Sequence, residues 1–195
     1  MVHTIAHYAI LTCWVILVLY WMANWSSVKP NQEDQSVSRR LRWVRYGIGI
    51  LAALLLQFGE GIPVIGHRLA FLPRSSPALN VAVIILAVSG MVVAVMARRT
   101  LAGNWSGEVV VKKDHELIQT GVYAYARHPI YTGFLLLMLG TALLVGTPVA
   151  FMILIVMALG VRSKSRKEEI LMIRCFPDQY PDYQARVKAI IPFIW

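Results

Sequence analysis

The sequence is poor in charged residues. Only 15% of its 195 residues are Asp, Glu, Lys or Arg, whereas an ordinary soluble domain has about 25%. Hydrophobic residues make up 57% of the chain, and the mean hydropathy is +0.59. This composition excludes a typical soluble protein and indicates an integral membrane protein. We expect a single domain over residues 1–195, because the polar segments are too short for a separate soluble domain.

Cysteine is equally scarce. Cys13 lies in the first apolar run and Cys175 in the last polar segment, so the two should lie at different levels, and we expect no disulfide. His115 has no second histidine or cysteine at metal-ligand spacing, and we expect no metal. The N-terminus lacks a basic region and a clear cleavage site, so the first apolar run is predicted to be a retained helix.

Acidic residues are also few. The chain has 10 Asp and Glu against 19 Lys and Arg, which gives a net charge of +9. A nucleic-acid partner is not needed to explain this excess, because membrane proteins collect basic residues in their cytoplasmic loops and near anionic lipid headgroups. We therefore expect membrane lipids, and no nucleic acid, among the partners.

Long runs with little or no charge are abundant. Crossing the hydrocarbon core of a membrane takes about 20 residues, and runs of this kind cover residues 5–25, 43 to about 65, and 78–97. Residues 130–161 form a run of 32, or about 48 Å of helix, which is too long for one ordinary crossing. The breaker Gly146-Thr147-Pro148 near its middle predicts a helical hairpin at about 130–161.

The basic residues distinguish four crossings from five. Five crossings place 17 of the 19 on one side, whereas four would expose the seven that follow Val161 on the other side. Because cytoplasmic loops are enriched in Lys and Arg, we predict an all-α integral membrane protein with five transmembrane helices. Its N-terminus would lie outside, and its C-terminal region would be cytoplasmic.

Two polar clusters flank the predicted hairpin. The first, residues 121–133, combines tyrosines with Arg127, His128 and a proline, and the second, residues 162–169, combines four cations with Glu168-Glu169. The hairpin would bring both clusters to one face of the membrane. Anchoring at an interface needs fewer such groups, so the arrangement predicts a functional site.

Each of these groups also has a purely structural explanation. Arg127 and His128 would serve as a cap and an interfacial anchor for the next helix, and the tyrosines, Tyr125 first among them, as an aromatic belt. The glutamates would pair with basic neighbours on a solvated helix. Of the two, we expect Glu168 to be functional and Glu169 structural.

The tail from residue 165 to 195 is predicted to be helical, with an interruption at Pro177 and a second short helix over residues 180–189. We expect it to fold back over the cytoplasmic ends of the helices. It would then act as a lid over the site, or alternatively lie as an amphipathic helix on the surface.

A series of short motifs runs from about His115 to the end of the chain. They are His115-Glu116-Leu117-Ile118, Gly121-Val122-Tyr123, Arg127-His128-Pro129-Ile130-Tyr131-Thr132-Gly133, Glu168-Glu169, Phe176, Tyr180, Tyr183, Val187 and Ile191-Pro192. This arrangement resembles the isoprenylcysteine carboxyl methyltransferase family. Related phospholipid methyltransferases share a similar C-terminal pattern, so the resemblance specifies the cofactor better than the acceptor.

The resemblance implies a carboxyl O-methyltransferase that uses S-adenosylmethionine and acts on a prenylated cysteine or a similar lipophilic acceptor. Residues 1–97 would supply three N-terminal helices, and residues 98–195 the cofactor-binding and catalytic part, with the active site on the cytoplasmic side. The cofactor-binding positions that the resemblance implies are His115, Leu117, Ile118, Gly121, Tyr123, His128, Pro129, Tyr131 and Glu168.

The basic residues before the glutamate pair fall near the acceptor by the same resemblance. Lys164 stands four positions before Glu168, where an arginine is expected. This departure leaves the acceptor-binding cation open among Arg162, Lys164 and Arg166, which together with Glu168 form the expected catalytic group.

The residue types suit this chemistry independently. S-adenosylmethionine presents a sulfonium, a charged amino-acid head, a ribose diol and an adenine. These groups call respectively for a polarisable or anionic wall, ionic partners, a carboxylate, and an aromatic or apolar slot. A carboxylate acceptor is already ionised, so catalysis needs orientation, which can supply about 7–11 kcal/mol, rather than a general base. An amine-methylating phospholipid methyltransferase and a non-enzymatic lipid-binding or scaffold protein are the alternatives.

Overall fold

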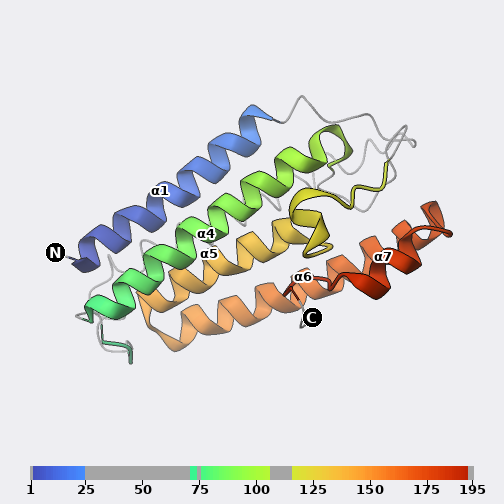
Figure 1. Cartoon of the computed structure of the whole chain (residues 1–195). Coiled ribbons are helices and arrows are strands. Elements are labelled where there is room, and N and C mark those ends of the chain that lie inside the picture. The colour runs from blue at the N-terminus through green and yellow to red at the C-terminus, as the bar shows by residue number, and fades with distance from the viewer. Residues whose placement is uncertain (1, 25–70, 74–75, 106–115, 193–195) are drawn as a thin grey trace, which may run out of the picture.

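The computed structural model describes residues 2–24, 71–73, 76–105 and 116–192 (Figure 1). Every regular element within these ranges is a helix. The α-helices are α1 (Val2–Ala23), α4 (Pro77–Leu101), α5 (Pro129–Val145), α6 (Pro148–Cys175) and α7 (Tyr180–Arg186), and the short 3₁₀ helices are η2 (Ala102–Asn104) and η3 (Gly121–Ala124).

Three of the described helices, α1, α4 and α6, are long and apolar enough to cross a membrane, and α5 is a shorter apolar helix of 17 residues. An all-helical membrane protein is therefore confirmed over the part of the chain that the structure describes. The helix expected at residues 43 to about 65 lies outside the described residues, so the count of five crossings stays a prediction.

Helices α4 and α5 pack with their backbones in close contact. A Cβ atom added to Gly133 would lie 2.5 Å from the carbonyl oxygen of Gly90 and 2.7 Å from the amide nitrogen of Ala94. No side chain larger than hydrogen fits there without movement of a backbone. The two glycines thus let the helices approach closely, as small residues do in membrane helix pairs.

Helix α1 lies alongside this pair (Figure 1). It buries Ile10 and Leu17 in a common apolar core with Val83 of α4 and Leu137 of α5. The indole nitrogen of Trp14 donates a hydrogen bond of 3.2 Å to the hydroxyl of Thr141. These three helices form a scaffold, and the described elements α6, η2 and η3 pack against it.

Helix α4 runs past the expected end at Ala97 to Leu101. Arg98 is 2% exposed, and its guanidinium donates to the carbonyl oxygens of Ala102 at 2.6 Å and Asn24 at 3.0 Å. It also lies over the ring of Trp105, 4.8 Å from the centroid. Because a cation at a helix C-terminus satisfies carbonyl groups, Arg98 ends α4 and ties it to the end of α1.

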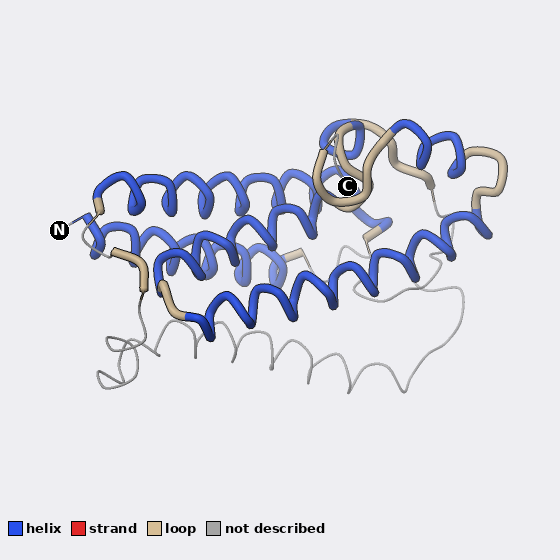
Figure 2. Tube along the Cα trace, turned by 90° about the horizontal axis from the view of Figure 1, so that it is seen from below, coloured by secondary structure: helices blue, strands red, loops and turns tan. Residues whose placement is uncertain are grey.

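The apolar run 130–161 is broken where the breaker predicts. Gly146 adopts a left-handed conformation with φ of 67°, which glycine tolerates. The hydroxyl of Thr147 accepts a hydrogen bond from the amide of Ala150, and Pro148 occupies the first turn of α6. Helix α6 then runs back beside α5 (Figure 2).

Helix α6 does not stop at the end of the apolar run. It continues without a break through the polar cluster to Cys175, whereas the sequence suggested an apolar span and a separate tail helix. Residues 161–175 contain no glycine or proline, and Lys, Arg and Glu are good helix formers. The glutamate pair therefore lies on the same rigid helix as the membrane span.

The tail reverses direction after α6. Helix α7 ends at Arg186, so the expectation of a helix to residue 189 was wrong. Val187 is extended, and the next residues pair with the segment before α5: the amides of Arg127 and His128 donate to the carbonyl oxygens of Lys188 and Ala189 at 2.9 and 2.8 Å. The tail thus lies against the start of α5.

Candidate functional site

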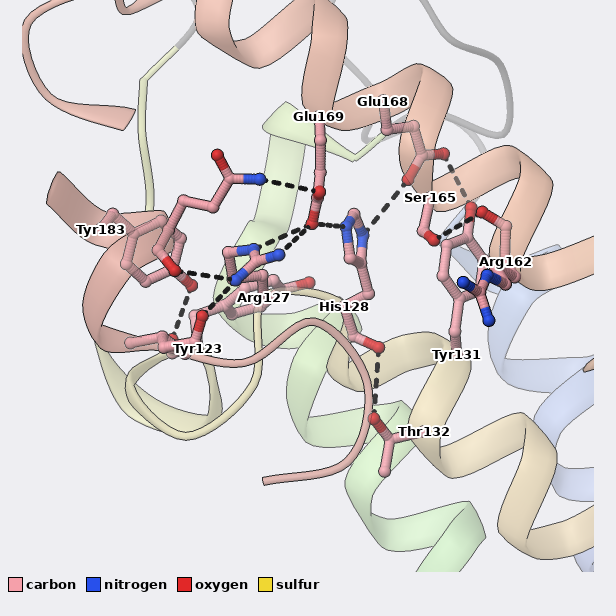
Figure 3. A network of polar contacts seen from close by, with 12 residues as sticks. Tyr123, Arg127, His128, Tyr131, Thr132, Arg162, Ser165, Glu168, Glu169 and Tyr183 are labelled. Atoms are coloured by element: carbon pink, nitrogen blue, oxygen red, sulfur yellow. Dashed lines mark hydrogen bonds and ion pairs between the residues drawn. The ribbon is translucent and has the colours of Figure 1, made fainter. Parts of the chain in front are cut away.

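The two polar clusters of the sequence meet at one end of the helices (Figure 3). The first cluster lies on η3 and at the start of α5, and the second on the polar half of α6. His128 precedes Pro129, and its carbonyl oxygen accepts from the first turn of α5 through the amides of Tyr131 and Thr132. The helix start therefore holds the His128 side chain in place toward α6.

Both carboxylate oxygens of Glu169 have hydrogen-bond partners in the site. Its Oε1 accepts hydrogen bonds from Nε and Nη2 of Arg127 at 2.8 and 2.6 Å, and it lies 3.2 Å from Nε2 of His128. Its Oε2 accepts from the side-chain amide of Gln184 at 3.0 Å. The side chains of Arg127 and Glu169 are only 8% and 13% exposed, so this is a nearly buried ion pair.

Glu168 has different partners and is more open. Its Oε1 accepts a hydrogen bond of 2.7 Å from the hydroxyl of Tyr131, and its Oε2 lies 3.4 Å from Nδ1 of His128. Lys164 lies one helical turn earlier on α6, and its Nζ is 3.8 Å from Oε1 of Glu168. With a side chain that is 21% exposed, Glu168 keeps acceptor capacity for a further donor.

His128 bridges the two glutamates (Figure 3). Its ring stacks on that of Tyr131 with centroids 5.6 Å apart, and only a protonated imidazole donates from both nitrogens. Burial disfavours the charged ring, but the hydrogen bonds and negative charges of Glu168 and Glu169 outweigh burial, so the pKa of His128 lies above its ordinary value.

Arg127 also fastens the tail to this site. Its Nη1 donates to the backbone carbonyl oxygens of Gln184, at 3.2 Å, and of Val187. The hydroxyl of Thr132 donates to the carbonyl oxygen of Ile190 at 2.5 Å. The C-terminal segment is thus held by the same residue that neutralises Glu169.

Two tyrosines form a further contact between the tail and η3. The hydroxyl of Tyr183 donates a buried hydrogen bond of 2.6 Å to the carbonyl oxygen of Tyr123. Burial raises the pKa of Tyr183 to about 12 and that of Tyr123 well above its ordinary value. Both phenols therefore stay protonated, and Tyr183 remains a donor at neutral pH.

The structure brings three of the residues expected at the cofactor into contact. His128, Tyr131 and Glu168 are in direct contact, Pro129 is buried, and Leu117 and Ile118 are half-buried in the segment before η3. Gly121 has φ of +61° and faces Thr100 of α4. Tyr123 is buried beneath α7 and presents its carbonyl oxygen to Tyr183. His115 lies outside the described residues.

The three basic residues expected to bind the acceptor have different surroundings. Lys164 lies beside Glu168 and over the ring of Tyr131, with Nζ 5.5 Å from the centroid. Arg162 is exposed, and its backbone carbonyl oxygen accepts a hydrogen bond of 3.0 Å from the hydroxyl of Ser165 (Figure 3). Arg166 is exposed as well.

Sequence reasoning did not assign the residues that bind Glu169. Arg127 was expected in the polar cluster of the site, with a cap or an interfacial anchor as the structural alternative, but no partner was assigned to it; its side chain forms the central ion pair. Gln184 carried no signal, because a lone amide in a tail is uninformative. Tyr183 was visible only as part of the family pattern. Tyr125 is 64% exposed, which fits its expected place in an aromatic belt.

The family model and the curated proteins that match this chain carry the same family name. Residues 82–174, a little under half of the chain, match the model of the isoprenylcysteine carboxyl methyltransferase (ICMT) family. The chain is 36% identical over 113 residues to protein-S-isoprenylcysteine O-methyltransferase of Saccharomyces cerevisiae, which covers 56% of this chain and 47% of the yeast protein. The rat protein of the same name is 33% identical over 122 residues, or 60% of this chain and 42% of its own.

A solved structure has a similar fold. The eukaryotic intramembrane Ras methyltransferase ICMT aligns with a TM-score of 0.59 at 24% identity, over 84% of this chain and 55% of its own. The chain thus spans about half the length, or less, of the relatives that it matches. The resemblance seen in the sequence is confirmed: residues 82–174, which carry His128, Tyr131 and the glutamate pair, match the isoprenylcysteine carboxyl methyltransferase family.

Proposed function

We propose that this protein is an integral membrane methyltransferase that uses S-adenosylmethionine and methylates the carboxylate of a prenylated cysteine or a similar lipophilic acceptor. The observation that carries the proposal is the contact of Glu168 with Tyr131 and His128 at the end of a membrane helix. The yeast and rat relatives are named protein-S-isoprenylcysteine O-methyltransferase, which supports the same reaction.

The residues present fit the proposed cofactor. Glu168 is a partly exposed carboxylate beside the aromatic ring of Tyr131, suited to a ribose diol or an ammonium group. Leu117 and Ile118 supply apolar side chains before η3. Glu169 is already saturated by Arg127, His128 and Gln184. We therefore assign Glu168, and not Glu169, to the cofactor, together with the other positions that the family resemblance implies.

Bound S-adenosylmethionine would supply an electrophilic methyl group on a positively charged sulfur. The chain's own residues would bind, orient and exclude water, which suffices for an acceptor that is already an anion. Lys164 is the first candidate for holding that anion by a charge-assisted hydrogen bond, because it lies beside both Glu168 and Tyr131. Arg162 is the second, and Arg166 the third.

We further propose the arrangement in the membrane. Five crossings, an outside N-terminus and a cytoplasmic site agree with the excess of basic residues in the segments that would face the cytoplasm. The tail would be a lid over the cofactor, since Arg127 joins it to the helix that bears Glu168. Residues 98–195 would then form the catalytic part and residues 1–97 the supporting helices.

A methyl-transfer assay tests the proposal. Membranes containing the protein are incubated with radiolabelled S-adenosylmethionine and a farnesylated cysteine analogue, and the product is treated with mild alkali. Label released as volatile methanol is the expected result, because a methyl ester hydrolyses under these conditions. Label that stays in an alkali-stable lipid amine would instead identify a phospholipid methyltransferase. Failure of the purified protein to bind S-adenosylhomocysteine in calorimetry would favour a non-enzymatic lipid-binding protein.

A further inference from the structure

The polar half of α6 carries a basic and apolar stripe on its outer face. We call this set the outer stripe; all its members are exposed, and they are Arg166, Lys167, Ile170, Ile173 and Arg174. They recur at intervals of three and four residues, which places them on one side of a helix. The only acidic residues of α6, Glu168 and Glu169, are bound to the residues of the polar site. The charges of the outer stripe are therefore all positive.

The length of α6 sets the level of the outer stripe relative to the bilayer. At about 1.5 Å per residue, Lys167 lies about 28 Å and Arg174 about 39 Å along the helix from Pro148. A bilayer has a hydrocarbon core of about 30 Å and a thickness of about 40–45 Å with its headgroups. With the turn before Pro148 at one boundary of the core, the outer stripe lies in the headgroup layer of the opposite boundary.

The side chains match that layer. Ile170 and Ile173 are 53% and 38% exposed, and apolar side chains flanked by cations are typical of helix faces at a membrane interface. Long basic side chains bury their stems in the interface and extend their charges to the phosphates. We propose that the outer stripe binds the headgroups of anionic phospholipids and so holds Glu168, on the other side of the same helix, at a set height above the core. This inference does not depend on the methyl-transfer reaction.

Lipid binding to purified protein tests the charges. Phosphatidylglycerol and phosphatidylcholine adducts are compared by native mass spectrometry for the wild type, for Lys167→Gln/Arg174→Gln, and for the matched control Arg186→Gln/Lys188→Gln, which removes two exposed cations of the tail. A cation near an anionic surface contributes about fivefold in affinity. We expect the preference for phosphatidylglycerol to fall at least fivefold in the first variant and to stay within twofold in the control. An unchanged preference, or an equal fall in the control, overturns the proposal.

The depth of the outer stripe is a second, independent test. A spin label on Ile170→Cys and one on Asp178→Cys, an exposed position beyond α6, are compared in vesicles of phosphatidylglycerol and phosphatidylcholine, with Cys13 and Cys175 replaced. Collisions with an aqueous nickel chelate should be several-fold fewer at position 170. Equal collision rates would place the outer stripe in water, open to an acidic protein rather than to lipid, and would overturn the proposal.

Discussion

Helix α5 contacts two of its neighbours, α4 and α6, in opposite ways. Against α4 the contact is made by backbone, with Gly133 facing Gly90 so closely that a methyl group has no room. Against α6 and the tail it is made by polar side chains at one end, through Arg127 and His128 just before the helix start. The first interface is uncharged and close-packed, and the second is charged and partly open.

Because one interface is close-packed and the other is charged, their stability depends on different properties. A close-packed contact depends on volume and is insensitive to pH, and it loses stability when a methyl group is added. A charged contact depends on partners being present in the right ionisation state. The proposed cofactor would enter and leave through the second interface and not through the first. We call the contacts of Arg127 and His128 with Glu169 and the tail the polar closure. We expect the scaffold to be fixed and the polar closure to open.

The strongest test of the polar closure is removal of its central cation. Arg127→Met leaves Glu169 without its main partner in a nearly buried position, and breaking a buried ion pair costs about 3–5 kcal/mol. Because Arg127 also holds the carbonyl oxygens of Gln184 and Val187, the loss should appear as opening of the tail. Hydrogen exchange of the amides of residues 180–190 measures it.

Arg186→Met is the matched control for this experiment. Arg186 is exposed and bonds to the side chain of Gln119 at 3.3 Å, and exposed substitutions usually change stability by less than about 0.5 kcal/mol. Exchange in the tail should stay near that of the wild type. Equal protection of the tail in Arg127→Met and the wild type would show that the ion pair does not hold the closure.

The two glutamates should respond differently to the same substitution. Glu168→Gln is expected to weaken binding of S-adenosylhomocysteine by about 1.5–3 kcal/mol, as for a lost hydrogen bond to a charged group. Glu169→Gln should mainly loosen the tail, because its carboxylate is bound to Arg127 and Gln184. Calorimetry and hydrogen exchange on both variants separate the effects, and unchanged affinity in Glu168→Gln would contradict its assignment to the cofactor.

The close-packed interface is tested by adding one methyl group. In Gly133→Ala the new Cβ would meet the backbone of Gly90 and Ala94, and overpacking of this kind costs about 1–3 kcal/mol. Gly160→Ala in α6 is the control, since a Cβ there meets nothing within 4 Å and a helical Gly→Ala change stabilises by about 0.5–1 kcal/mol. In dodecyl sulfate, the free energy of unfolding of the solubilised protein should fall for Gly133→Ala and rise for Gly160→Ala. Equal changes in the two variants would show that the close approach of α4 and α5 does not limit stability.

Much of the scaffold could be predicted from the sequence. Apolar runs of membrane length predict α1 and α4, and Gly146-Thr147-Pro148 predicts the reversal between α5 and α6. These features follow from local chemistry: composition, chain length and the conformations open to glycine and proline. The continuous course of α6 was missed because the change from apolar to charged residues suggested a boundary that its helix propensity does not impose.

The partners within the site could not be predicted in the same way. Glu168 and Glu169 are adjacent on one helix, and the helical pattern alone does not say which one meets Arg127. The answer comes from the tail, which returns beside the start of α5 and presents Gln184 to Glu169. Contacts between segments about 40 and 60 residues apart depend on how the helices are placed, and no local pattern encodes that placement.

A smaller effect is expected at the edge of the closure. Tyr183→Phe removes the buried hydrogen bond to the carbonyl oxygen of Tyr123, which should cost about 1 kcal/mol. Tyr125→Phe is the control, because its side chain is largely exposed. Proteolysis of the tail should be faster in the first variant only. Equal cleavage rates would mean that the tail is held by Arg127 without help from Tyr183.

The smallest expected effect is the pH dependence of the closure. Since Glu168 and Glu169 raise the pKa of His128 above its ordinary value of about 6.5, the protonated ring favours the closed tail. Its contribution is fully present below about pH 6.5 and is lost as pH rises through the higher pKa of the folded protein. Exchange of the tail amides, corrected for intrinsic rates, should therefore increase with pH above 6.5 in the wild type. His128→Gln should abolish that increase, because a neutral amide has no proton to lose in this range. His7→Gln, a substitution in α1, should retain the increase.

The scaffold provides an internal control for the same measurement. The contact between Gly90 and Gly133 contains no ionisable group, so exchange of the α4 amides should stay constant over the same pH range. A parallel rise of exchange in α4 would show that pH acts on the whole fold rather than on the polar closure.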